Sequence, residues 1–343
     1  MKFTKEVIWT IKNFILDNIE THPNDIVQIA SDYFRVSKPT ILKYIRELIS
    51  QKQIERHGNG RYPNYKLQTV KFEFKYKNKE LQEDVLWAND ISNKLKDVQP
   101  NVKEICQYGF TEIVNNVIDH SGSEDLTVFF EINHKLICIT VRDFGVGIFN
   151  KIKQDLGLSD PKHSILELAK GKFTSDPDNH TGEGIFFSSR MFDHFHILSH
   201  KLSYFGQGNE DGWLFEDPDD VDIDGTVVLM KIRKDSEIKM NEIFNEFADP
   251  DKTPGFHRTK IPVELMQHEG ELLLSRSQAK RLITRFDKFL EVVLDFKGVT
   301  QIGQAFADQV FRVFKNAHPN IHLIPVNMNE NVRRMVERIQ KGT

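Results

Sequence analysis

Hydrophobic residues recur at helical spacing through the first 50 positions of the chain. The isoleucines that share one face of the first expected helix are Ile8, Ile11, Ile15 and Ile19. A second helix is expected over 25–34, and a third begins after Ser37, a residue type favoured at helix N-caps. Alternating residues at 54–57 and 61–65 predict a hairpin around the turn at 58–60. This segment is therefore expected to form three helices and two strands.

The pattern changes near residue 70, where apolar and polar residues alternate over 70–76 and predict a strand with one buried face. Helices are expected near 79–95 and over about 101–119. Further expected strands are 126–132, 136–141, 195–200 and 226–232. Helices combined with a largely antiparallel sheet indicate an α/β sandwich.

Towards the C-terminus the expected strands and helices alternate. The strands are 263–267, 271–274, 290–296 and 321–326, and the helices are 277–289, 305–314 and 330–339. Proline, glycine and aspartate mark 249–255 as a linker. The chain is thus predicted to be an α/β multidomain protein with three domains, at 1–67, 68–240 and 261–343.

Charge is distributed unevenly along this chain of 343 residues. Its formal net charge is −4, but residues 1–66 hold 11 Lys and Arg against 7 Asp and Glu. That segment therefore carries +4, and the remainder must carry −8 to give the total. A positive excess confined to one segment favours contact with nucleic acid.

Neither the cysteines nor the hydropathy indicates export. Cys106 and Cys138 do not lie in a metal-spaced cluster, so neither a disulfide framework nor a zinc site is expected. No stretch approaches the ~18 to 20 apolar residues of a membrane helix. The N-terminus lacks the long apolar stretch of a signal peptide. A cytoplasmic protein without membrane contact is expected.

The order of helices and hairpin over 1–67 resembles a winged helix-turn-helix domain. The resemblance implies that the third helix is a recognition helix and that the hairpin is the wing. The residues offered to double-stranded DNA are Lys38, Thr40, Lys43 and Tyr44 on this helix and Arg56 and Arg61 on the hairpin. Protein contact or dimerisation is the alternative use. A homodimer is expected, since paired winged helices contact paired half-sites.

A polar stripe interrupts the helix expected over 101–119. Glu112, Asn116 and Asp119 stand at i, i+4 and i+7, and therefore on one face, among apolar neighbours. Polar side chains on such a helix are costly unless they meet water, a metal or a ligand. A carboxylate can accept a proton from water, and an amide oxygen suits Mg²⁺. A solvated helix face would explain the stripe if it stood alone.

Two glycine-rich turns follow the stripe. The residues of the first are Asp143, Gly145, Gly147 and Ile148, and those of the second are Thr181, Gly182, Gly184 and Ile185. Glycine lets the backbone approach a flat ligand closely. The N–H groups at the start of the helix expected over 186–192 can bind phosphate. Each turn alone is weak evidence, because such turns also close ordinary hairpins.

Together the stripe and the turns resemble the GHKL ATP-binding superfamily, which includes DNA gyrase, sensor histidine kinases and MutL-type mismatch repair proteins. The resemblance covers about 75–235 and implies ATP and Mg²⁺ as ligands. It implies that Glu112 is the general base that orients the attacking water, and that Asn116 is the Mg²⁺ ligand. Asp119 would support the pocket, and Asp143 would hydrogen-bond the adenine amine.

The same resemblance implies nucleotide contacts for both turns and for a later threonine. These residues are Gly145, Gly147, Ile148, Thr181, Gly182, Gly184, Ile185 and Thr226. The segment 149–180 matches a mobile lid, in which Lys172, Thr174 and His180 are candidates to reach the γ-phosphate. An ordinary surface loop is the equal alternative for those three. His120 is interpreted as a helix end in preference to a pocket residue.

The last domain resembles a STAS-like domain in its element order and in the run 294–299. Related domains are partners of GHKL serine kinases in bacterial anti-sigma switches. Their acceptor serine lies just before the helix that follows the equivalent of Val299. Residues 301–306 contain no serine, and Thr300 is better explained as a strand-end or capping residue. The domain is therefore interpreted as a module that binds a protein partner or senses a signal.

These features predict a regulator of bacterial type that couples Mg-ATP binding, with slow hydrolysis, to DNA or partner binding by the flanking domains. Two alternatives stay open: a serine/threonine protein kinase of the anti-sigma type, and a nucleotide-gated interaction switch without hydrolysis. An interaction protein with a dead site is disfavoured, because every key atom is present.

Overall fold

The computed structural model describes most of the chain. The chain forms two compact units. The described residues are 3–58, 63–173, 182–207, 210–216, 222–248, 256–267 and 272–341. Outside them lie the turn residues 59–60, Arg61, Thr174, His180, Thr181 and the expected linker at 249–255. One unit comprises Met1–Glu73, Phe129–Cys138 and Arg233–Asp235, and the other comprises Phe74–Val128, Ile139–Ile232 and Ser236–Thr343.

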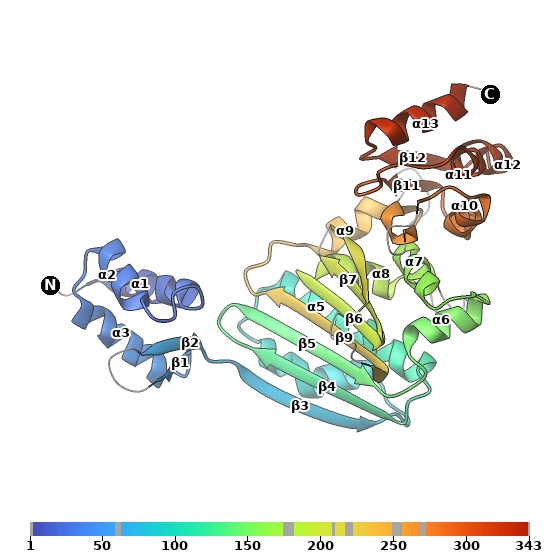
Figure 1. Ribbon diagram of the computed structural model, residues 1–343. Helices are drawn as coiled ribbons and strands as arrows, with labels where there is room; N and C mark the ends of the chain where they lie inside the picture. The colour runs from blue at the N-terminus through green and yellow to red at the C-terminus, as the bar shows by residue number, and fades with distance from the viewer. Residues whose placement is uncertain are drawn as a thin grey trace. The chain divides into compact units, whose positions relative to one another are not determined.

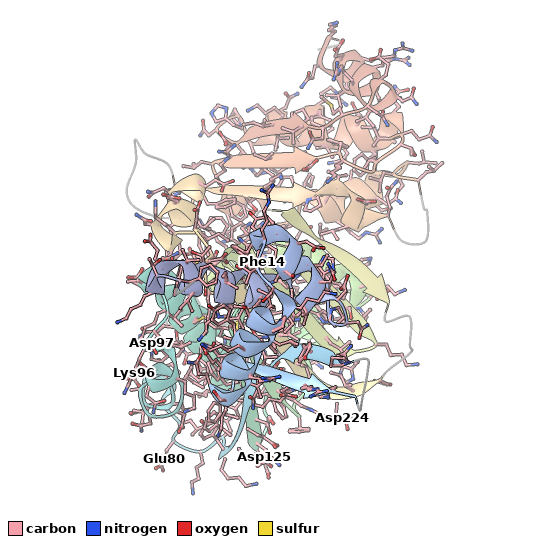
Figure 2. All side chains as sticks on the ribbon, turned by 90° about the vertical axis from the view of Figure 1, so that its left-hand side faces the viewer. Phe14, Glu80, Lys96, Asp97, Asp125 and Asp224 are labelled. Atoms are coloured by element: carbon pink, nitrogen blue, oxygen red, sulfur yellow. The ribbon has the colours of Figure 1, made fainter. Side chains whose placement is uncertain are left out.

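The first unit begins with the three helices and the hairpin that the pattern predicts. They are α1 (Lys5–Asn18), α2 (Ile26–Phe34), α3 (Lys38–Ser50), β1 (Ile54–His57) and β2 (Asn64–Leu67). The two strands are antiparallel. The isoleucine face of α1 packs into a core with α2, α3 and both strands. Phe14 of α1, labelled in Figure 2, stacks on Tyr33 with ring centroids 4.5 Å apart.

One residue expected on the outer face of α3 is buried. Tyr44 is only 4% exposed and joins the core, so its predicted position on the DNA-facing side is wrong. The apolar face of α3 is wide enough to include it, because Tyr44 follows Ile41 by three residues. Lys38 and Lys43 are exposed as expected, and Thr40 is partly buried.

A seven-stranded sheet has the strand order β3-β4-β5-β9-β6-β7-β8. The strands are β3 (Val70–Lys77), β4 (Asp125–Ile132), β5 (Leu136–Asp143), β6 (His194–His200), β7 (Leu202–Gln207), β8 (Glu210–Glu216) and β9 (Ile223–Arg233). β6 is antiparallel to both β7 and β9, and β7 is antiparallel to β8. The sequence pattern did not predict β7 and β8; each contains a glycine, and β8 also contains three acidic residues.

Helices cover the sheet (Figure 1). The long helix α5 (Pro100–His120) lies where the polar stripe predicts it. The helix expected over 79–95 is instead three short pieces: α4 (Glu83–Leu86), a π-helix at Trp87–Ile91 and a 3-10 helix at Ser92–Leu95. The segment expected as a lid contains two helices, α6 (Ile148–Leu156) and α7 (Lys162–Lys170). They are followed by α8 (Gly184–Met191) and, after β9, by α9 (Met240–Phe247).

The C-terminal part of the second unit is built on three parallel strands in the order β10-β11-β12. These are β10 (Arg258–Pro262), β11 (Glu291–Asp295) and β12 (His322–Val326). The strand expected at 263–267 is wrong: Val263–Met266 forms a 3-10 helix directly after β10. Leu273, in the strand expected at 271–274, makes a single bridge to Ile302, and residue 271 lies outside the described ranges.

Helices surround this parallel sheet. They are α10 (Arg276–Ile283), α11 (Gln304–Asp308), a π-helix at Gln309–Phe314, α12 (Lys315–Ala317) and α13 (Glu330–Lys341). The helix expected over 277–289 ends at Ile283, because Arg285 takes a left-handed conformation with φ 64° before a short 3-10 turn. No helix in the described ranges is both long and apolar enough to cross a membrane.

Candidate functional site

A cavity of about 270 Å³ opens in the second unit between α5, the start of α6 and the start of α8. It brings together residues of the polar stripe, of both glycine turns and of β9. The predicted residues that line it are Glu112, Asn116, Asp143, Gly147, Ile148, Gly182, Gly184, Ile185 and Thr226. These segments lie far apart in the sequence, so the fold itself assembles the cluster.

The cavity-facing side of α5 differs slightly from the predicted stripe. Glu112 and Asn116 line the cavity, and so do Asn115 and His120. Asp119 is exposed and is not among the lining residues. Each helical residue turns by about 100°, and the face towards the cavity is centred between Asn116 and His120. His120 is the last residue of α5, as interpreted, and it also lines the cavity.

Gly184 leaves the space that the carboxylate of Glu112 occupies. A Cβ at this position would lie 2.1 Å from Oε2 of Glu112, far inside van der Waals contact. Glu112 therefore sits against the first residue of α8. The N–H groups at the beginning of a helix have no partner within the helix, and the helix dipole favours negative charge there. The carboxylate is thus next to a place that suits an anion.

Asp143 supplies a buried carboxylate at another part of the cavity. It is 3% exposed, and it accepts a hydrogen bond of 2.9 Å from the backbone N–H of Gly145. The hydroxyl and the N–H of Thr226 also donate to it. Burial raises the pKa of Asp143, and these three hydrogen bonds oppose that shift. Such a carboxylate can accept a hydrogen bond from an amine that enters the cavity.

The first glycine turn is fixed by close packing around Asp143. The N–H of Ile148 donates to Oγ1 of Thr226 over 3.0 Å, which ties the start of α6 to β9. Gly147 has φ 79°, and a Cβ there would lie 2.5 Å from Oγ of Ser199. Gly145 does not line the cavity; a Cβ on it would meet the carbonyl oxygen of Ser121 at 1.9 Å. The absence of a side chain at Gly145 therefore lets the turn pack against the backbone of Ser121.

A further glycine was missed by the sequence interpretation. Gly225 has φ 78°, and a Cβ there would lie 2.3 Å from the carbonyl oxygen of Asp143. It allows β9 to approach β5 closely enough for Thr226 to hydrogen-bond the Asp143 carboxylate. Its position directly before Thr226 in the sequence is the signal that could have identified it.

Residues of the second glycine turn also line the cavity. Gly182 has φ 68°, and its carbonyl accepts a hydrogen bond of 3.2 Å from the N–H of Phe173, another lining residue. Lys151 is the one basic side chain other than histidine among the lining residues, and its Nζ lies 2.6 Å from Oδ1 of Asp155. The sequence interpretation missed this pair. Both residues line the cavity because they lie on the same side of α6.

Lys172, one of the residues considered for the γ-phosphate, does not line the cavity. Its Nζ donates to the carbonyl of Lys288 over 3.1 Å and lies above the rings of Phe256 and Phe289. Burial lowers the pKa of Lys172. Thr174, His180 and Thr181 lie outside the described residues.

Two residues that line the cavity could hold a metal ion that is bound together with another ligand. Across the described ranges, no group of three or more His, Cys, Asp or Glu side chains is arranged to hold a metal ion. Glu112 and Asn116 nevertheless place a carboxylate and an amide oxygen on the same wall. Mg²⁺ binds through one or two such oxygens plus water and phosphate oxygens. These residues therefore fit Mg²⁺ bound together with a phosphate compound.

Comparison with protein families identifies the C-terminal segment. Residues 278–333 match the family described as STAS-like domain of unknown function (DUF4325). This range includes most of α10 and all of β11 and β12, so the sequence resemblance of this region to STAS-like domains is confirmed. A search of curated proteins finds no match to the chain. The cavity lies outside the matched segment.

Proposed function

We propose that this chain is a regulator of GHKL type that binds Mg-ATP in the cavity and hydrolyses it slowly. The observation that carries the proposal is the convergence, in one cavity, of the α5 pair, both glycine turns and Thr226. An unrelated helix face and two ordinary turns would have no reason to meet around a buried carboxylate. The proposed architecture is a winged helix, a Bergerat-type α/β sandwich and the STAS-like region.

Each lining group has a task in this proposal. Asp143 accepts a hydrogen bond from the exocyclic amine of adenine, as a desolvated carboxylate can. The phosphates lie towards Gly182, the N-terminus of α8 and Lys151, where backbone N–H groups and a positive charge favour anions. Asn116 would hold Mg²⁺, which would neutralise phosphate charge. Glu112 orients a water molecule and accepts its proton.

The proposal is tested with the full chain by calorimetric titration with Mg-ATP and by phosphate release. Wild type should bind ATP, and Glu112→Gln should bind within about threefold of it while phosphate release falls about 100-fold or more, as expected for loss of a general base. A wild-type chain that binds no ATP would refute the nucleotide site. Phosphate release unchanged by Glu112→Gln would refute the role of Glu112.

A matched pair of lysine variants on α6 tests where the phosphates lie. Lys151→Met removes the charge at the cavity, whereas Lys153→Met removes one that is not among the lining residues. Lys151→Met should weaken ATP binding about tenfold, and Lys153→Met should have little effect. Equal effects from both substitutions would indicate that Lys151 makes no phosphate contact.

A second candidate activity for the same site is phosphate transfer to a protein, which the STAS-like region brings into consideration because related domains accept phosphate. Incubation with ATP followed by mass spectrometry separates the two. Stoichiometric phosphate on a residue of the chain, such as Thr300, would favour the kinase. ATP bound with neither release nor transfer would favour a switch without hydrolysis.

We propose that residues 1–67 bind double-stranded DNA, with α3 as the recognition helix. The support is the exposed basic groups Lys38, Lys43 and Arg46 on α3 and Arg56 on β1. Replacing the three α3 residues by alanine should weaken binding and reduce the slope of log K against log salt by about 0.9 for each phosphate that is no longer neutralised. Lys96→Ala, an exposed lysine in the other unit, is the control. Binding insensitive to the triple substitution would exclude this face.

A further inference from the structure

A second cluster of charged side chains is buried away from the cavity, at the end of α7. Lys170 is fully buried and Glu167 is 2% exposed. Nζ of Lys170 donates to Oε1 of Glu167 over 2.6 Å and to the carbonyls of Arg281 and Thr284 over 3.2 and 2.9 Å. The two carbonyls belong to the segment at and after α10, so a charge on α7 is satisfied by the C-terminal region.

Arg285 of the STAS-like region completes this cluster. One end of its guanidinium donates to Oε2 of Glu167 over 2.9 Å. The other end donates to the carbonyl of Gly171 over 2.8 Å and to that of Lys172. Gly171 and Lys172 directly follow α7, and here Arg285 supplies a partner for their carbonyls from more than a hundred residues away. Arg285 itself has a left-handed backbone conformation.

The same short stretch of α7 and its extension forms part of the cavity wall. Leu168 and Phe173 line the cavity, and between them lie Lys170, Gly171 and Lys172, whose side chain or carbonyls belong to the cluster. The hydroxyl of Thr259 on β10 adds a hydrogen bond of 2.8 Å to the carbonyl of Lys170. At Gly171 a Cβ would lie 2.6 Å from the ring of Phe256, so this turn has little freedom to move. The wall and the C-terminal region are therefore fixed by one set of interactions.

We infer that Arg285 is a positioning residue for the cavity: by holding the end of α7, the STAS-like region sets the positions of Leu168 and Phe173, so that nucleotide binding and docking of this region favour each other. The inference rests on the proposed nucleotide site. Coupling of this kind is reciprocal. A ligand that needs the wall in place must slow the separation of Arg285 from α7. Conversely, removal of the Arg285 guanidinium must weaken binding of that ligand.

The cluster favours coupling because it is satisfied only in the docked arrangement. When the C-terminal region separates, Lys170 loses the carbonyls of Arg281 and Thr284, and the carbonyls of Gly171 and Lys172 lose the guanidinium. The stretch between Leu168 and Phe173 then lacks the hydrogen bonds that tie it to the C-terminal region, and a ligand must order that stretch as it binds. That ordering reduces affinity.

The experiment compares Arg285→Met, Arg285→Lys and the control Arg334→Met in the full chain. Arg334 also pairs with a glutamate, but its side chain is 74% exposed and far in sequence from this cluster. Titration with Mg-ATP should show about tenfold weaker binding for Arg285→Met, within the usual range of coupling between sites. Arg334→Met should bind like wild type.

Two further readouts separate positioning from simple structural support. Arg285→Lys keeps the charge beside Glu167 but not the planar guanidinium that also reaches two carbonyls. Its urea unfolding midpoint should therefore stay near that of wild type, while its ATP binding should be several-fold weaker. Hydrogen exchange over residues 276–290 should slow when Mg-ATP is added to wild type, and should not respond in Arg285→Met.

The outcomes distinguish this inference from the function on which it rests. If wild type binds no ATP, the proposed nucleotide site fails and the coupling fails with it. If wild type binds ATP and a folded Arg285→Met or Arg285→Lys binds it equally, only the coupling is refuted. Exchange over 276–290 that is unaffected by ATP in wild type would refute it as well.

Discussion

Two carboxylates in this protein are buried to nearly the same extent but meet opposite surroundings. Glu167 is 2% exposed and Asp143 is 3% exposed. Two cations, Lys170 and Arg285, contact Glu167. In the part of the chain that the structure describes, the groups that hydrogen-bond Asp143 are neutral, namely the Gly145 N–H and Thr226. One cluster is complete within the protein, whereas the other faces a cavity.

This difference separates a buried charge that is paired within the protein from one that borders a cavity. A buried carboxylate is costly unless it is paired and hydrogen-bonded. At Glu167 the protein provides the pairing itself, and the cluster joins two parts of the chain. At Asp143 the protein provides enough hydrogen bonds to tolerate the carboxylate, and leaves an acceptor directed at the cavity. Substitutions at the two sites should therefore have opposite consequences for stability and binding.

The largest expected effect is on stability at the complete cluster. Glu167→Leu leaves Lys170 and Arg285 without their counter-charge, and should lower the free energy of unfolding by about 3 to 5 kcal/mol. Equilibrium urea unfolding followed by circular dichroism measures the change. The control is Glu330→Leu, which removes a glutamate from an exposed pair with Arg334 and should cost at most about 1 kcal/mol.

Adding Lys170→Met to Glu167→Leu should restore part of the lost stability, because the fully buried cation is then gone as well. If Glu167→Leu were as mild as Glu330→Leu, the cluster would not hold the end of α7, and the contrast with Asp143 would disappear.

At Asp143 the expected effect falls on binding. Asp143→Asn should weaken ATP binding about 10- to 100-fold, since a hydrogen bond to a charged group contributes about 1.5–3 kcal/mol. The free energy of unfolding should stay within about 1 kcal/mol of wild type, because the substitution also removes a buried charge. Calorimetric titration and urea unfolding on the same samples test both parts.

Asp97→Asn makes the same change at an exposed position and should leave both ATP binding and stability as in wild type. An Asp143→Asn protein that binds ATP normally but is strongly destabilised would show that Asp143 has a structural role like that of Glu167.

The smallest expected effect, taken per pH unit, is a dependence of stability on pH. Burial lowers the pKa of Lys170 from 10.5 to about 8. Below pH 8 this lysine is protonated in both the folded and unfolded chain. Between about pH 8 and 10.5 the folded chain releases a proton that the unfolded chain keeps, so the free energy of unfolding rises relative to Lys170→Met. The rise is at most about 1.4 kcal/mol per pH unit.

Urea midpoints of wild type and Lys170→Met at pH 7.5, 8.5 and 9.5 measure this slope. Parallel curves would mean that Lys170 keeps an ordinary pKa and that its pairing with Glu167 fully offsets its burial.

The parts of the site that the sequence predicted are those encoded by local rules. The helix with Glu112 and Asn116 has a clear apolar period, and Gly147, Gly182 and Gly184 occupy turns that need glycine. The errors also have local causes. Asp119 shares the helix face of Glu112 but is exposed and does not line the cavity, whereas Asn115 and His120 do. Helical spacing gives the face of a residue but not whether a cavity reaches it.

Contacts between distant segments could not be predicted in this way. Nothing around Lys170 or Glu167 in the sequence distinguishes them from an exposed i, i+3 pair, and Arg285 lies within a stretch that looks helical. The cluster exists because the chain ends α10 early and turns at Arg285, which the pattern of apolar residues does not encode. Only the fold brings the three together.

Gly184 has a consequence for how this protein can change over generations. The codons for glycine and alanine differ by one base, and the alanine methyl group would take the space of the Glu112 carboxylate. A single mutation can thus displace that carboxylate. A copy with alanine at position 184 should therefore lack the role proposed for Glu112.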